Sequence, residues 1–333
     1  MKMSNLEKLG ITTGLLYESP TPRHLRTVLT ALHDICDEVS FRCKKDGIYI
    51  CEYPSSGDIV VNIHINPSEL EQTYELANGE MFILTFETSQ ILKYMTVLQN
   101  DLPFIMYYDF YNTAVPCLHI TSRDPNNSHT GSGKVSIMNE TNDQEYDIKC
   151  PSLMRVELPS SEFLNLVNHM TTIGGTRGKM EIRLSIGSDS GDYVEIEAYD
   201  ETNNDNGWRE RFNSVVTDLT AQEKLSDVPE TPIIDSNDDL CDEKSYELIS
   251  RQHDSRPAKR RRFERCDDGS DPIMFKQQYR LNNLKSIGKI ASIVSTVEFV
   301  FLKHESETII FTIQMDVPNL GKVNFMLNAL AVE

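Results

Sequence analysis

Basic residues are scarce in this sequence. The 333-residue chain has 32 Lys and Arg against 51 Asp and Glu, which gives a formal net charge of −19. Nucleic-acid binding needs clustered Lys and Arg, so the overall charge argues against it. That argument fails only where charge is segregated, because an acidic exterior does not forbid a basic inner surface.

The sequence also lacks the segments that direct a chain into a membrane. The N-terminus has no apolar signal core, and no apolar run approaches the ~18 residues of a membrane span. The seven cysteines form no C-x-x-C pair and show no metal-ligand spacing. We therefore expect a protein of a reducing compartment, with buried or incidental thiols, no metal site and no membrane contact.

Catalytic motifs are missing as well. Residues 174–179, GGTRGK, resemble a phosphate-binding loop with one residue too few between the glycines, and Met180 stands where Ser or Thr would hold magnesium. No Ser/His/Asp or H-E-x-x-H arrangement is found, and the acidic run at 235–243 lacks the spacing of a calcium loop. We expect neither an enzyme nor a cofactor.

Amphipathic helices are what the sequence does contain, and the clearest lies at residues 21–38. Thr21 can cap its start, and Pro22 suits the first helical position, where its missing N–H costs nothing. The apolar stripe, with helical spacing, is Leu25, Val28, Leu29, Leu32 and Ile35. The opposite face carries Arg23, Arg26, Thr30 and His33.

The order helix, strands, helix, hairpin occurs twice along the chain. Further helices are predicted at 89–99, 160–173 and 281–292. Strands are predicted at 12–17, 39–42, 47–52, 59–65, 81–86, 104–111, 115–121, 153–158, 179–186, 193–199, 208–213, 275–280, 298–302, 308–315 and 322–327. We expect an α+β fold of two similar domains, 1–139 and 153–333, joined by a connector at 140–152, with the helices aligned on one face of antiparallel sheets.

The second half is longer because of residues 218–272. This segment is rich in Asp, Glu, Ser and Pro and has no sustained periodicity, so we interpret it as a disordered insertion. It contains a compact basic run. The run is either a nuclear-import signal, a polyanion-binding patch or a solvated charge run, and its core is Lys259, Arg260, Arg261 and Arg262.

Three stretches together resemble the proliferating cell nuclear antigen (PCNA) family of DNA sliding clamps. They are LHDICDEVSFRCKKDGIYICEYPSSGDIVVNIHI at 32–65, which contains a strand, a two-serine turn and the next strand, VELPSSEFLNLVNHMTTIGG at 156–175, and FTIQMDVPNLGKVNFMLNAL at 311–330. The resemblance covers nearly the whole chain outside the insertion. It implies a head-to-tail ring of three subunits, with the helices lining a basic hole around duplex DNA and the sheets outside.

The resemblance also implies sites. The residues expected to contact DNA, without sequence preference, are Arg23, Arg26, His33, Lys93, Arg177, Lys179, Lys285 and Lys289. The third helix departs from the family pattern and offers only Asn165, Asn168, His169 and Thr172. The expected pocket for partner peptides comprises Tyr53, Tyr146, Ile148, Met326, Asn328 and Ala329. The expected subunit interface pairs edge strands near 134–138 and 208–212, and comprises Lys134, Val135, Ile137, Trp208, Arg209 and Phe212.

A clamp of this kind tethers a DNA polymerase and other replication and repair proteins, is opened by a clamp loader, and acts in the nucleus. Two alternatives stay open: a subunit of a heterotrimeric checkpoint-type clamp, and a monomeric viral processivity factor. The divergence from cellular clamps and the long insertion suggest a large DNA virus as the source, in which case the compartment is the site of viral replication.

Overall fold

A computed structural model describes residues 14–67, 73–77, 81–110, 116–122, 132–138, 150–174, 178–186, 193–200, 203–212, 273–281, 283–303 and 309–330. The predicted insertion and its basic run, most of the connector, and Arg177, Tyr146 and Ile148 lie outside these residues. Within them the chain forms antiparallel sheets and four helices, as the predicted α+β class requires. No helix in this part of the chain has the length and apolar character needed to cross a membrane.

The N-terminal end of the molecule is a five-stranded antiparallel sheet in the order β5-β1-β7-β8-β9. Its strands are β1 (Gly14–Ser19), β5 (Thr73–Leu76), β7 (Phe104–Asp109), β8 (Cys117–Ser122) and β9 (Ser132–Ser136). The opposite end is a four-stranded antiparallel sheet in the order β13-β12-β11-β14. Its strands are β11 (Gly178–Ile186), β12 (Tyr193–Asp200), β13 (Asn203–Phe212) and β14 (Ile273–Arg280).

An eight-stranded antiparallel sheet joins the two ends, in the order β10-β15-β16-β17-β4-β3-β2-β6. The first half contributes β2 (Glu38–Lys44), β3 (Gly47–Glu52), β4 (Ile59–Ile65) and β6 (Phe82–Glu87). The second half contributes β10 (Ser152–Pro159), β15 (Thr296–Lys303), β16 (Ile309–Val317) and β17 (Gly321–Leu327). The halves meet where β17 pairs with β4, from Gly321 opposite Ile65 to Leu327 opposite Ile59. Backbone hydrogen bonds therefore run continuously across the central sheet, from one half of the chain to the other.

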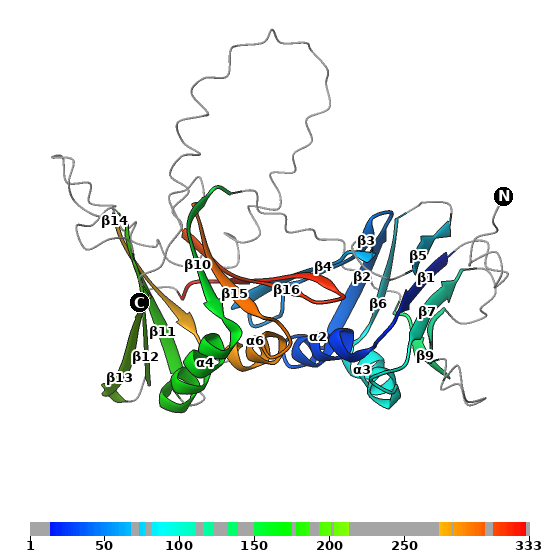
Figure 1. Cartoon of the computed structure of the whole chain (residues 1–333), viewed down its shortest axis with the longest axis horizontal. Helices are drawn as coiled ribbons and strands as arrows, with labels where there is room; N and C mark the ends of the chain where they lie inside the picture. The colour runs from blue at the N-terminus through cyan, green and yellow to red at the C-terminus, as the bar shows by residue number, and fades with distance from the viewer. Residues whose placement is uncertain are drawn as a thin grey trace, which may run out of the picture.

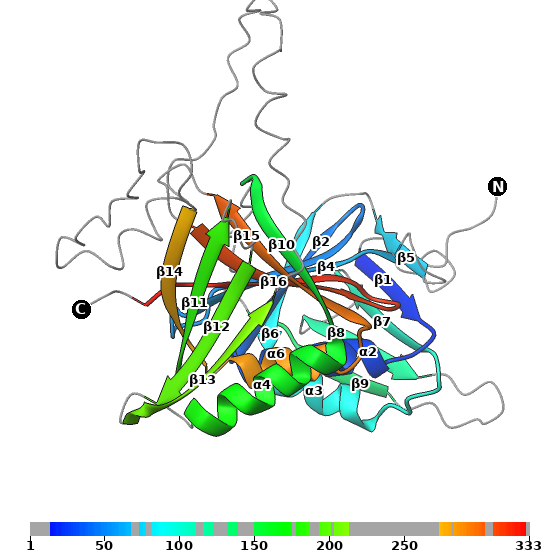
Figure 2. The same cartoon turned by 60° about the vertical axis from the view of Figure 1, so that its left-hand side comes forward.

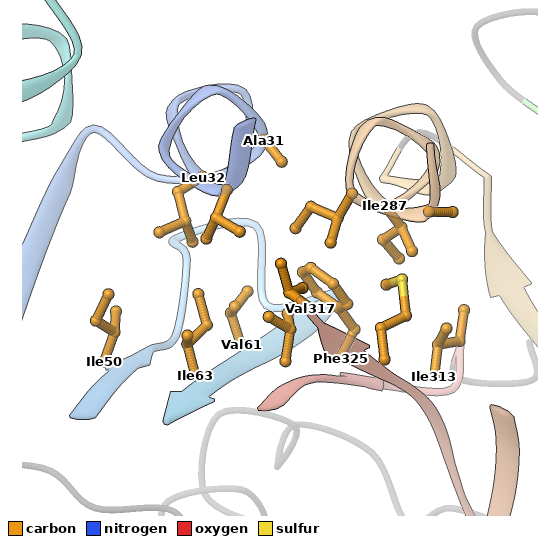
Figure 3. Close-up of a cluster of buried hydrophobic side chains, with 14 of the residues drawn as sticks. Ala31, Leu32, Ile50, Val61, Ile63, Ile287, Ile313, Val317 and Phe325 are labelled. Carbon is orange, nitrogen blue, oxygen red and sulfur yellow. The ribbon is translucent and has the colours of Figure 1, made fainter. Parts of the chain in front are cut away.

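Four helices lie in a row on one side of the sheets: α4 (Ser160–Gly174), α6 (Leu284–Ala291), α2 (Arg23–His33) and α3 (Thr88–Val97) (Figures 1 and 2). Neighbours in this row contact one another. Their apolar stripes face the sheets. Figure 3 shows Leu32 of α2 and Ile287 of α6 pointing toward Val61 and Phe325 of the central sheet, all of them buried. This packing leaves the polar stripes of the helices on a common outer face.

Most strands predicted from local pattern match the structure to within two residues at each end, with three larger differences. β5 was not predicted: it is a short strand that pairs only with β1. β9 was not predicted from local pattern either, and only the family resemblance indicated an edge strand near 134–138. β13 begins at Asn203, five residues before the predicted start at Trp208. The residues Asn-Asn-Asp-Asn-Gly at its start are poor strand formers, but this strand is held by pairing with β12, where Asp200 lies opposite Asn203. At the start of β13, tertiary pairing overrides local propensity.

Candidate nucleic-acid interface

The outer face of the helix row is basic although the chain is acidic. In the part of the chain that the structure describes, the four helices carry five Lys or Arg and one acid, Glu162. The basic residues are Arg23, Arg26, Lys93, Lys285 and Lys289. Charge is thus segregated onto the helix row, which is the condition under which an acidic chain can still face a polyanion.

Arg23 stands exposed at the first turn of α2. The helix is fixed here by Thr21, whose hydroxyl oxygen accepts a hydrogen bond from the Arg23 N–H (3.2 Å) and donates one to the Asn100 carbonyl (2.6 Å). The Pro22 carbonyl accepts the first helical bond, from the Arg26 N–H (2.9 Å). Thr21 and Pro22 therefore lie at the start of the helix, but Pro22 occupies the N-cap position, one residue later than the predicted cap at Thr21, and the helix begins at Arg23.

Arg26 is placed differently from Arg23, because its guanidinium contacts the turn that follows α3. It donates hydrogen bonds to the Leu98 carbonyl (2.6 Å) and to Asn100 Oδ1 (2.8 Å). Burial lowers the pKa of Arg26 from its usual value. These contacts tie α2 to the end of α3, so part of the hydrogen-bonding capacity expected for DNA is already used inside the protein.

Lys289 is also engaged. Its ammonium group forms an ion pair with the carboxylate of Asp34, which directly follows α2, and Ser286 Oγ donates a hydrogen bond to the same carboxylate oxygen (3.0 Å). Lys93 and Lys285, by contrast, are exposed and form no ion pair among the described residues. His33 is exposed at the end of α2. The row thus contains both free and paired cations.

The polar face of α4 is nearly uncharged. Asn165, Asn168, His169 and Thr172 are all exposed, as the sequence predicted, and the Thr172 hydroxyl donates to the Asn168 carbonyl (2.7 Å). Lys179 does not supplement them. In β11 the core residues Met180 and Ile182 alternate with Lys179, so Lys179 lies on the face of the sheet that points away from the core. We therefore leave Lys179 out of the proposed DNA-facing set.

Comparison with known proteins identifies the fold. No family model and no curated protein sequence matches the chain. The structure of proliferating cellular nuclear antigen from Entamoeba histolytica matches 95% of this chain and 98% of its own, with a TM-score of 0.63 at 11% sequence identity. The chain has the PCNA clamp fold. This bears out the divergent resemblance seen in the sequence, while a viral source finds no support.

In the clamp fold of this chain, the residues predicted for partner peptides surround the turn between β3 and β4. Asn328 Nδ2 donates to the Gly57 carbonyl (2.7 Å), and the Tyr53 hydroxyl approaches the same oxygen (3.4 Å). Met326 is buried, and Ala329 packs against the core. The described members of the predicted set therefore lie together. A binding pocket at this place stays a prediction.

The last described residues of the clamp fold are anchored by their backbone. The Asn328 N–H donates to the Asp58 carbonyl (2.9 Å), and the Leu330 N–H donates to the Gln278 carbonyl of edge strand β14 (2.8 Å). Arg280 of β14 forms an ion pair with Asp58 (3.2 Å). The segment is thus fixed between the β3–β4 turn and the four-stranded sheet, a set of contacts that no sequence motif indicated.

The strands predicted to pair between subunits are edge strands of the two end sheets. β9 ends the five-stranded sheet and β13 ends the four-stranded sheet. In β9, Lys134 is exposed, whereas Val135 is fully buried in the chain's own core, and the following Ile137 is half-buried. In β13, which contains Trp208, Arg209 pairs with Glu197 (3.1 Å) and Phe212 packs edge-on against Phe299. An interface here would therefore use strand backbone and the exposed charges more than buried apolar side chains.

Proposed function

We propose that the chain is a sliding clamp that encircles duplex DNA and tethers a DNA polymerase and other replication and repair proteins. One observation carries the proposal beyond the fold: the four described helices carry five basic residues against one acid, Glu162, and Asp34 at the end of α2 adds only a second, in a chain of net charge −19. A basic surface of this kind suits the phosphate backbone, which is read without sequence preference. Among the described residues of this row, the free cations are Arg23, Lys93 and Lys285.

The proposed assembly is a homotrimeric ring. Two complementary edge strands at opposite ends of one chain, β9 and β13, are what a head-to-tail ring needs. In this proposal the domains are 1–139 and 153–333 with a connector at 140–152, the ring is opened by a clamp loader, and partners dock beside Tyr53, Asn328 and Ala329. We also propose that the protein acts in the nucleus, with Lys259–Arg262 as its import signal.

The first test is the solution mass of the full chain by light scattering over a range of concentrations. A mass of three chains that withstands dilution is expected, together with retention on circular DNA and release when the circle is cut. A monomer that stays on linear DNA would refute the ring and point to the monomeric processivity factor. A chain that forms no ring until other subunits are added would point to the checkpoint-type heterotrimer.

The second test concerns the DNA-facing surface. Lys93→Ala and Lys285→Ala should each weaken binding to a short duplex, and should reduce the salt slope of log K by about 0.9 for each phosphate that the protein no longer neutralises. Lys322→Ala is the matched control, since Lys322 is an exposed lysine of β17 whose neighbours Val323 and Phe325 face the core. Equal weakening in all three variants would contradict a DNA surface on the helices.

A further inference from the structure

Asp34 is an acid placed within the basic helix row. It directly follows His33, the last residue of α2, and lies against α6. Its carboxylate oxygen Oδ2 forms an ion pair with the ammonium group of Lys289 and accepts a hydrogen bond from the hydroxyl of Ser286. The side chains of Lys289 and Asp34 are 41% and 37% exposed. The ion pair therefore lies at the surface, where a phosphate could reach it.

The position of Asp34 is unfavourable for an acid on local grounds. The end of a helix carries the negative pole of its dipole, so a carboxylate at the end of α2 gains nothing from its own helix. Lys289 occupies the last turn of α6, where a cation is favoured. Asp34 is thus held by residues of α6, a helix more than half the chain away in sequence, and it neutralises one of the five cations of the row.

We propose that Asp34 sets the affinity of the helix row for duplex DNA by competing with phosphate for Lys289. This inference rests on the proposed clamp function. While Asp34 holds Lys289, that lysine adds no net charge to the face that meets the duplex. A phosphate that approaches α6 must displace the carboxylate, or share the ammonium group with it. Removing the acid would free one cation in each subunit.

The same ion pair also links the two halves of the chain. A purely structural role of Asp34 therefore has to be distinguished from its proposed competition with phosphate. A structural link predicts that removing Asp34 lowers stability and leaves DNA affinity unchanged or weaker. Competition with phosphate predicts tighter binding. The two roles therefore move DNA affinity in opposite directions, which makes the sign of the change decisive.

The experiment measures binding of the full chain to a short fluorescent duplex by anisotropy, between about 50 and 200 mM salt. Asp34→Asn keeps the shape and removes the charge. It should bind about three- to tenfold more tightly at the low end of this range, with a salt slope steeper by about 0.9 for each additional phosphate neutralised. Asp34→Ser is a second variant with the same expected direction. Thermal melting of both variants confirms that the proteins measured are folded.

Two further variants test the route through Lys289. Asp34→Asn combined with Lys289→Ala should show none of the gain, and Lys289→Ala alone should weaken binding, because it leaves the Asp34 carboxylate without its cation on the same face. Ser286→Ala is the matched control, because it removes a hydrogen bond from Asp34 and keeps both charges. Its DNA affinity should match that of the unchanged protein.

Unchanged or weaker binding by both Asp34 variants would overturn the inference, and so would a gain that persists without Lys289. Failure of the clamp proposal looks different. If Lys93→Ala and Lys285→Ala leave DNA binding unaltered, the helix row is not the DNA surface at all. If they weaken binding and the Asp34 variants do not strengthen it, only the role given to Asp34 is wrong.

Discussion

Replacing Glu181 with Gln tests the charge cluster on the outer face of the four-stranded sheet. Glu181 lies in β11 and is only 4% exposed. Its carboxylate accepts hydrogen bonds from Arg183 (2.6 Å), Lys276 (2.8 Å) and Gln278 (3.3 Å). A carboxylate buried this far is tolerated because each of its oxygens has a donor. The neutral amide of Gln would lose the ion pairs with Arg183 and Lys276.

The expected cost follows from these contacts. A hydrogen bond to a charged group contributes about 1.5–3 kcal/mol, and the substitution weakens the interactions with two charged partners, Arg183 and Lys276. The partners recover part of this, because the Lys276 side chain is 50% exposed and Arg183 keeps Glu195 and Glu197. Solvent screening of the exposed partners lowers the figure further. We therefore expect the free energy of unfolding at pH 7 to fall by about 2 kcal/mol.

The pH dependence gives a second signature. Burial acts to raise the pKa of Glu181, but the hydrogen bonds from Lys276, Arg183 and Gln278 outweigh it, and the pKa in the folded protein is lowered. A carboxyl group with a lowered folded pKa stabilises the protein above its unfolded pKa of about 4.3 and loses that contribution as the pH falls through the folded value. The difference between the two proteins should therefore be constant from neutral pH to about pH 6 and shrink below about pH 4.

Urea denaturation at several pH values measures this difference. Glu298→Gln is the matched control, since the Glu298 side chain is 41% exposed and has an ion pair with Arg155 at 3.7 Å. An exposed pair of this kind contributes within about 1 kcal/mol. The reasoning is refuted if Glu181→Gln costs no more than Glu298→Gln at pH 7. It is refuted equally if the cost of Glu181→Gln is the same at low pH.

Two further predictions concern two glycines and two arginines. Gly321 has φ +134°, and a Cβ there would lie 2.1 Å from the His64 carbonyl oxygen. Gly321→Ala should therefore lower the free energy of unfolding by more than about 2 kcal/mol in urea denaturation, because it strains the β17–β4 junction. Gly288→Ala in α6 introduces only ordinary contacts and should raise the free energy of unfolding by about 0.5–1 kcal/mol. Arg26→Ala should lower the free energy of unfolding by about 1–3 kcal/mol with little change in the salt slope of DNA binding. Arg23→Ala should leave stability nearly unchanged and reduce the salt slope. The same outcome for both variants would contradict their different placement.

The helices were predictable because their signal is local, although α2 ends at His33, five residues before the predicted end at Glu38, and leaves Ile35 outside the helix. The stripe Leu25, Val28, Leu29 and Leu32 is almost completely buried, as a period of 3.6 residues requires. β3 and β4 were predicted with their observed bounds, because Gly and Asp punctuate strongly alternating runs. β5 was not predictable in this way because it is only four residues long. The start of β13 was not predictable because its residues carry little strand signal and its partner strand holds it.

The candidate site was predictable only as a surface. Periodicity identified the exposed side of each helix, but it contains no information on contacts between segments far apart in the chain. Arg26 meets Asn100, and Asp34 meets Lys289, through tertiary packing alone. Lys179 shows the same limit on a strand, where the adjacent residues decide which face a lysine occupies. Residue type therefore predicted the sign of the charge on the helix row. Contacts made by the fold decide which of these cations remain available to bind phosphate.

The number of cations available to bind phosphate matters for a sliding clamp, because tighter binding to DNA opposes movement along it. Each phosphate that a cation neutralises strengthens nonspecific binding and its dependence on salt. Of the five basic residues on the described helices, Arg26 is bound to the turn after α3 and Lys289 to Asp34, while α4 contributes none. The three cations that remain in each subunit predict a salt slope of about −2.7 per subunit in full contact with DNA, at about −0.9 for each charge. In the proposed clamp, a ring that holds DNA by its closed topology needs no stronger binding than this, and the internal partners of Arg26 and Lys289 would keep the surface weak enough for sliding.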